Sequence, residues 1–163
     1  MGLGKSVQVL ARVVEGEATP AQKKAGYHGT LVVVPVAVME QWVGEVKNKT
    51  RSLKVTTHHG PSRAKVGAKL AKFDIVITTF QTLASEHGKY IKVKADTQQK
   101  LEEMDSSDEE EERTKKTKGK VAAKDSHALF EVKWLRVVIG RSSFLSTRSP
   151  QLSAHLANLC RIH

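Results

Sequence analysis

Gly4, Lys5 and Ser6 stand together near the start of the chain and have the types and order needed to bind a phosphate group. A phosphate-binding loop contains a glycine, four further residues and then Gly-Lys-Ser or Gly-Lys-Thr, and this segment matches its end. Backbone N–H groups around residues 2–5 and at the start of the following helix would surround phosphate oxygens. Lys5 would reach the β- and γ-phosphates, and Ser6 would ligate magnesium.

The predicted contacts with ATP and Mg²⁺ are Gly2, Leu3, Gly4, Lys5, Ser6 and Val7, with Ser6 as the metal ligand. Taken alone, a Gly-x-Gly-Lys-Ser pattern is equally typical of an ordinary glycine-rich turn. Two positions of the complete loop, and the strand that leads into it, would precede Met1.

The elements that must position this loop alternate between helix and strand. Apolar residues at helical spacing predict helices over 5–16, 37–48, 62–72 and, briefly, through Leu83. Short β-branched runs predict strands over 31–34, 53–57, 75–79 and 137–139, and residues 17–29 are predicted to form a loop. Strands that alternate with helices indicate an α/β fold, a parallel sheet with helices on both faces.

A long charged segment interrupts this alternation. Residues 87–128 have lysine-rich ends around an acidic run at 105–112 and no apolar periodicity, which predicts a disordered insertion. The resulting organisation is a partial lobe at 1–86, the insertion at 87–128, a returning core strand at 129–139 and a tail at 140–163. The acidic run is more often a solvated charged stretch than a regulated one.

Composition narrows the class of partner. The net charge of +10 over 163 residues favours polyanions, nucleic acid first, although a solubilising surface would have the same charge. The only cysteine is Cys160, so no intrachain disulfide is possible and a reducing compartment is expected. No stretch approaches the roughly 20 apolar residues that span a bilayer, so no membrane partner is expected.

Five segments in register resemble the Swi/Snf-type DNA-translocating ATPases of helicase superfamily two. They are Met1–Gln8, Leu31–Trp42, His58–Arg63, Asp74–Leu83 and Val132–Ile139. The resemblance covers residues 1–86 and 129–139 and implies a partial RecA-like P-loop lobe. The charged insertion before the last strand is similar to that of the Rad-type repair subgroup.

The resemblance implies roles for particular residues. It assigns the nucleotide contacts to Lys5 and Ser6, and contacts with a DNA strand to Pro35, Gln41, Thr78 and Thr79. Such contacts are made mainly to phosphates, so they would be independent of sequence. Thr78 and Thr79 have an alternative role as caps of the next helix, and Trp42 has one as a core residue. The family implies a nuclear protein that acts on DNA, with nucleosomes or histones as further partners.

The family's catalytic carboxylates are missing. An Asp-Glu-Ala-His box should follow Ile139, its Asp holding magnesium and its Glu positioning water, but Gly140 and Arg141 occupy these positions. We therefore expect an ATP-binding chain that neither hydrolyses ATP nor translocates. The alternative is a non-enzymatic, basic DNA- or chromatin-binding remnant. A one-base frame shift would restore the box, which predicts that 140–163 is out-of-frame peptide.

Overall fold

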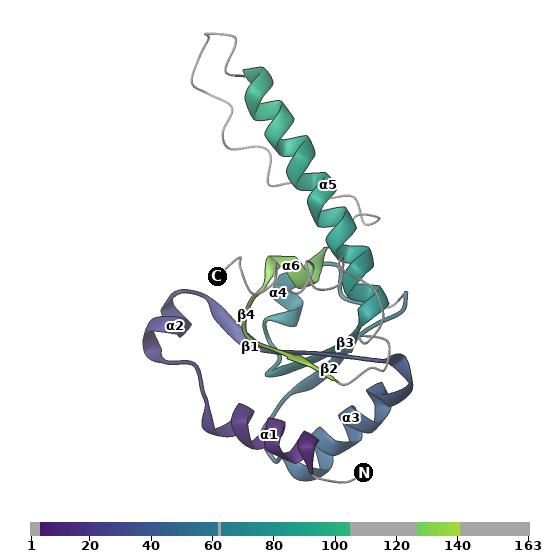
Figure 1. Ribbon diagram of the computed structural model, residues 1–163. Helices are drawn as coiled ribbons and strands as arrows, with labels where there is room; N and C mark the ends of the chain where they lie inside the picture. The colour runs from purple at the N-terminus through teal and green to yellow at the C-terminus, as the bar shows by residue number, and fades with distance from the viewer. Residues whose placement is uncertain (1–3, 62, 105–126, 141–163) are drawn as a thin grey trace.

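A four-stranded parallel sheet forms the centre of the chain in the computed structural model, which describes residues 4–61, 63–104 and 127–140 (Figure 1). The strands are β1 (Tyr27–Val34), β2 (Val55–His58), β3 (Ile75–Thr79) and β4 (Lys133–Ile139), in the order β2-β3-β1-β4. β1 pairs in parallel with both β3 and β4. The four predicted strands are present, but their bounds differ from those expected. β1 and β4 each begin four residues earlier, so residues 27–29 are strand rather than loop, and β2 begins two residues later. Residues 129–131 of the predicted returning strand are helical.

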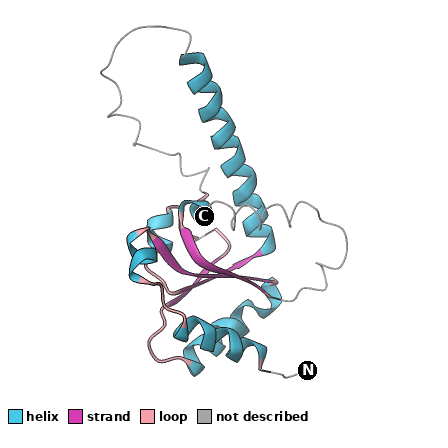
Figure 2. Ribbon diagram, turned by 60° about the vertical axis from the view of Figure 1, so that its left-hand side comes forward, coloured by secondary structure: helices cyan, strands magenta, loops and turns pink. Residues whose placement is uncertain are grey.

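Helices cover both faces of this sheet, which confirms the predicted α/β class (Figures 1 and 2). On one face lie α1 (Lys5–Glu15) and α3 (Val36–Lys49), and on the other lie α4 (Gly67–Leu70), α5 (Phe80–Met104) and α6 (Ala128–Glu131). A short α2 (Pro20–Lys24) precedes β1 inside the predicted loop. Thr19 and Gln22 form a capping box at its start, which stabilises so short a helix.

β1 is buried on both faces because apolar side chains point alternately to the two helix layers. Leu31 and Val33 join one apolar cluster, with Leu83, Leu129, Phe130 and Trp134. Val32 and Val34 join the other, with Leu10, Val13, Met39 and Val46. The continuous apolar run seen in the sequence is therefore a central strand shared by two cores.

The largest difference from the sequence prediction concerns residues 87–104. They were predicted to be disordered, but they continue α5 as far as Met104. Helix propagation costs little once a packed first turn exists, and this segment is rich in Lys, Gln and Glu, which favour helix. Leu83 and Glu86 are buried against the sheet and anchor that first part. Residues 105–126 of the predicted insertion lie outside the described residues.

The predicted basic helix over 62–72 is also shorter than expected. Among residues 63–72, which the structure describes, only Gly67–Leu70 is helical. Val66 before this helix is extended, with φ −131° and ψ 132°. Within the described ranges no helix is long and apolar enough to cross a membrane.

Truncation of the central strand tests this arrangement. Leu31→Ala should lower the free energy of unfolding by about 3 kcal/mol. The Leu31 side chain is fully buried, so its truncation removes buried apolar contacts and leaves a cavity in the core. Val14→Ala, at an α1 position whose side chain is 52% exposed, should change it by less than about 0.5 kcal/mol. Urea unfolding of both variants measures the two values, and equal losses would contradict the placement of β1.

Candidate functional site

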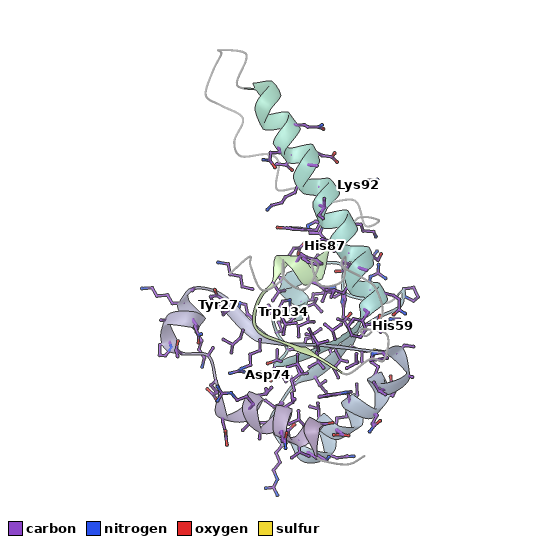
Figure 3. All side chains as sticks on the ribbon, viewed as in Figure 1. Tyr27, His59, Asp74, His87, Lys92 and Trp134 are labelled. Carbon is purple, nitrogen blue, oxygen red and sulfur yellow. The ribbon has the colours of Figure 1, made fainter. Side chains whose placement is uncertain are left out.

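The carboxyl ends of the four strands meet at one edge of the sheet, where open α/β folds bind ligands. β1 ends at Val34 before Pro35, and β4 ends at Ile139 before Gly140. The N–H of Gly140 donates to the carbonyl of Val33 at 2.8 Å, so the end of β4 is held against β1. Figure 3 shows His59, just after β2, at this end of the sheet and Asp74 at the other.

The start of α1 has the backbone geometry of an anion site. Gly4 lies in the left-handed region, with φ 59° and ψ 26°, which a residue without Cβ adopts at little cost. The first helical hydrogen bond runs from the N–H of Gln8 to the carbonyl of Gly4 at 3.0 Å. Helix geometry therefore leaves the N–H groups of residues 5–7 without an intrahelical acceptor, at the positive end of the helix dipole.

Several predicted nucleotide contacts cannot be located. Gly2 and Leu3, and the side chain of Lys5, lie outside the described residues. The Val7 side chain is exposed on the first turn of α1. Their roles as nucleotide contacts stay predictions.

Ser6 contacts a carboxylate that the sequence analysis missed. Its hydroxyl donates a hydrogen bond to Glu45 on α3. Gln41 Nε2 and Lys49 Nζ donate to the two oxygens of the same carboxylate, each at 3.3 Å. The predicted metal ligand Ser6 and the predicted DNA contact Gln41 are thereby joined through Glu45. The four-residue spacing of Gln41, Glu45 and Lys49 was the available signal, because it aligns them on one side of a helix.

This cluster controls the ionisation of Glu45. Partial burial raises the pKa of the carboxyl group, but hydrogen bonds from Ser6, Lys49 and Gln41, and the charge of Lys49, outweigh it. The net result is a pKa below the ordinary glutamate value, so Glu45 stays ionised at neutral pH. A carboxylate beside a hydroxyl is a suitable pair of ligands for a hard cation such as magnesium.

The side chains of Thr78 and Thr79 are buried at the end of β3. Thr78 Oγ1 donates to the carbonyl of His58 at 2.8 Å. Thr79 Oγ1 accepts from the N–H of Thr82 at 3.3 Å, which makes it the N-cap of α5. His59 Nδ1 lies 3.3 Å from Thr79 Oγ1 and 3.2 Å from Thr82 Oγ1. The capping alternative therefore holds for Thr79 but not for Thr78, whose hydroxyl bonds to β2 instead. Direct DNA contact by these two hydroxyls stays a prediction that requires the edge to open.

In the segment Leu31–Trp42, which resembles a family motif, the polar and aromatic residues lie partly on the surface and partly in the core. Pro35 is half-buried and precedes the first turn of α3, while Gln41 is exposed on that helix. Trp42 packs against the apolar cluster beneath the sheet, as expected of a core residue.

Gly140 occupies the position where the family's box would begin. A Cβ atom at residue 140 would lie 2.6 Å from Val34 Cγ1, closer than packed side chains allow. A carboxylate-bearing residue here would require Val34 to shift. Among the described residues, no group of three or more His, Cys, Asp and Glu side chains is arranged to hold a metal ion.

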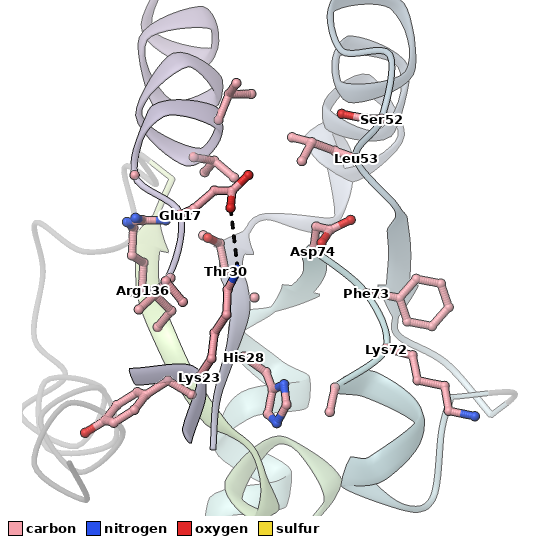
Figure 4. A pocket seen from close by; sticks show the side chains of 18 residues that line it. Glu17, Lys23, His28, Thr30, Ser52, Leu53, Lys72, Phe73, Asp74 and Arg136 are labelled. Atoms are coloured by element: carbon pink, nitrogen blue, oxygen red, sulfur yellow. Dashed lines mark ion pairs between the residues drawn. The ribbon is translucent and has the colours of Figure 1, made fainter. Parts of the chain in front are cut away.

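A cavity of about 500 Å³ opens at the opposite, amino-terminal edge (Figure 4). Its lining includes Thr30, Asp74 and Arg136, and the exposed ion pair Glu17–Lys23 lies across it at 3.5 Å. Burial and the nearby charge of Arg12 lower the pKa of Arg136. This cavity is separated by the length of the strands from the edge that carries the predicted motifs.

Comparison with known proteins identifies a family and several similar proteins. A family model described as "SNF2-related domain" matches residues 1–159, which includes most of the tail that the sequence analysis set apart. Transcription termination factor 2 of Drosophila melanogaster is 41% identical over 76 residues, which are 45% of this chain and 7% of that protein. ATP-dependent helicase ULS1 of Saccharomyces cerevisiae is 34% identical over 104 residues, 61% of this chain and 6% of that protein.

A third relative, DNA repair protein RAD5A of Arabidopsis thaliana, is 27% identical over 133 residues, 80% of this chain and 10% of that protein. The chain thus spans a tenth or less of these relatives. Among solved structures, the Sulfolobus solfataricus SWI2/SNF2 ATPase core in complex with dsDNA is similar, with a TM-score of 0.43 and 19% identity. The similarity covers 98% of this chain and 29% of that one.

The lowered pKa of Glu45 predicts a pH-dependent contribution to stability. A carboxyl group whose pKa is lower in the folded state stabilises above its unfolded pKa, and this stabilisation is lost as pH falls through the folded pKa. Glu45→Gln should therefore cost below about 1 kcal/mol at pH 7, and the difference from the unchanged chain should vanish between about pH 5 and pH 3. Urea unfolding across this range measures it, and a difference independent of pH would contradict the Glu45 cluster.

Proposed function

This chain belongs to the SNF2-related domain family, and we propose that it is the ATP-binding part of a Swi/Snf-type DNA-dependent ATPase acting in chromatin remodelling or DNA repair. The observation that carries the proposal is the start of α1, where left-handed Gly4 precedes a helix turn with unpaired N–H groups and Ser6. This backbone fits the phosphates of ATP, since donors and helix dipole both favour an anion. The names of relatives that act in transcription and repair support the nuclear role.

ATP with Mg²⁺ would be held by the N–H groups at the start of α1, by Lys5 and by the hydroxyl of Ser6. The ion would neutralise phosphate charge when bound. Glu45 accepts the hydrogen bond of Ser6 and so orients the oxygen that faces the ion. These residues account for binding but not for turnover.

We further propose that the chain as it stands does not hydrolyse ATP. Phosphoryl transfer depends on a carboxylate for the metal and another for water, and the end of β4 offers Gly140 instead. The close contact with Val34 leaves no space for a larger side chain in the present packing.

DNA is the second proposed ligand. The net charge of +10 favours a phosphate backbone, and the predicted DNA residues lie at or near the carboxyl-terminal edge or on α3, which starts there. Contact with nucleosomes or histones is the finer proposal and concerns the acidic run at 105–112, which would pair with basic partners.

Nucleotide binding is tested with the full chain and a fluorescent ATP analogue in magnesium. Lys5→Ala should weaken binding by roughly 10- to 100-fold, because a charged hydrogen-bond donor to the phosphates is lost. Lys24→Ala, at an exposed position of α2, is the matched control and should have no effect. Equal affinities for Lys5→Ala and the unchanged chain would remove the nucleotide site from the proposal.

The second candidate function is a DNA-binding remnant without a nucleotide site, favoured by the excess of basic residues. Affinity for duplex DNA should fall steeply with salt, with log K declining by about 0.9 per phosphate contact against log salt concentration. If Lys5→Ala leaves this binding unchanged and ATP does not bind, the remnant function is correct. If DNA binding is independent of salt, neither function stands as described.

A further inference from the structure

A carboxylate outside every predicted motif, that of Glu86 on α5, is fully buried beneath the carboxyl-terminal edge. His58 Nε2 donates to its Oε1 at 2.6 Å. Arg63 Nε lies 3.2 Å from the same oxygen, and the backbone N–H of Leu129 donates to Oε2 at 3.0 Å. The partners come from the end of β2, the segment after it and α6, so one side chain joins three elements to its own helix.

The chemistry of this cluster is specific. A buried carboxylate costs several kcal/mol unless it is paired and hydrogen-bonded. Here it forms an ion pair with one guanidinium, whose Nε makes no hydrogen bond, and it accepts hydrogen bonds from two other donors. His58 is also fully buried, and its Nδ1 has no partner among the described residues. Its proton is therefore assigned to Nε2, which the bond to Glu86 requires. Apolar packing alone does not require buried charged groups, so this cluster has a role beyond filling the core.

Glu86 and its partner Leu129 stand at the two ends of the charged segment. Glu86 lies in the anchored part of α5, which continues as far as Met104, and its partner Leu129 lies in α6, which begins at Ala128. The two described ends of the charged segment are thus bound to one carboxylate. Arg63, the ion-pair partner of Glu86, donates a hydrogen bond from Nη1 to the carbonyl of Gly60 at 3.2 Å, which holds the turn after β2.

We propose that Glu86 is a positioning residue that fixes the turn from His58 to Arg63 at the carboxyl-terminal edge and ties both ends of the charged insertion to it. Its effect on DNA binding rests on the proposed function, since the edge is the predicted DNA surface. The positioning itself does not depend on DNA and can be measured separately.

Hydrogen exchange of the full chain tests the positioning. Glu86→Gln keeps the shape of the side chain but removes its charge. Exchange at the amides of His59, Gly60, Arg63 and Leu129 should then rise about tenfold or more, while the central amides of β1 change less. Glu131→Gln is the matched control: Glu131 Oε2 accepts from the N–H of Gly67 at 2.6 Å, which joins α6 to α4, and its Oε1 lies 3.8 Å from His127 Nε2. A uniform rise over the whole chain after Glu86→Gln would overturn the proposal.

A second variant guards against loss of folding. Arg63→Gln removes the partly exposed partner and should raise exchange at His59 and Gly60 while β1 stays protected. No change there would equally overturn the proposal, even if Glu86→Gln did not fold.

A double-mutant cycle on duplex DNA affinity tests the functional link. Glu86→Gln should weaken binding about threefold or more, because a loosened turn must be ordered again on the DNA. This loss should disappear in the Arg63→Gln background; independent, multiplicative losses would mean that Glu86 does not act through Arg63. If no form binds DNA, the proposed function fails, while the exchange result still decides the positioning role.

Discussion

The burial of β1 on both faces is the constraint on which the other elements depend. Leu31, Val32, Val33 and Val34 are at most 1% exposed, and their alternate side chains supply both apolar clusters. A strand buried on both sides needs a helix layer above and below and a neighbour on each edge. β3 and β4 are those neighbours, and their parallel register with β1 places Thr79 opposite Val34 and Ile139 opposite Val33. The common edge of the candidate site follows from this pairing.

At the carboxyl-terminal edge of the sheet, buried polar side chains lie next to the apolar core. Thr78, Thr79, His58 and Glu86 are all fully buried there, and each has a hydrogen-bond partner. In a region of low dielectric constant such bonds are strong only when the partners are held in place, so the edge has little freedom to rearrange group by group. A ligand at this edge would therefore meet backbone groups and the surrounding exposed residues before these hydroxyls.

The start of α1 is attached differently. Leu10 and Val13 anchor the helix to the lower core, and Ser6 is linked to α3 through Glu45. Two predicted activities, nucleotide and DNA binding, therefore converge on α3, which begins at the carboxyl-terminal edge and presents Glu45 to α1. Gly140, at the position where the Asp-Glu-Ala-His box would begin, is instead hydrogen-bonded to β1 at the end of β4. The predicted nucleotide contacts and the position of the missing box thus lie on separate parts of the fold.

The sequence by itself determined the parallel α/β sheet, the four strands and the helices α1 and α3, because apolar runs and helical spacing are local patterns that burial enforces. It also determined the family, through motifs whose order is visible along the chain. Only the tertiary structure decided the length of α5 and the partners of Ser6, Thr79 and Glu86. Propagation of α5 depends on an anchored first part, and the bonds of Glu86 join residues 28 and 43 positions apart. No local pattern specifies contacts made by folding distant segments onto one another.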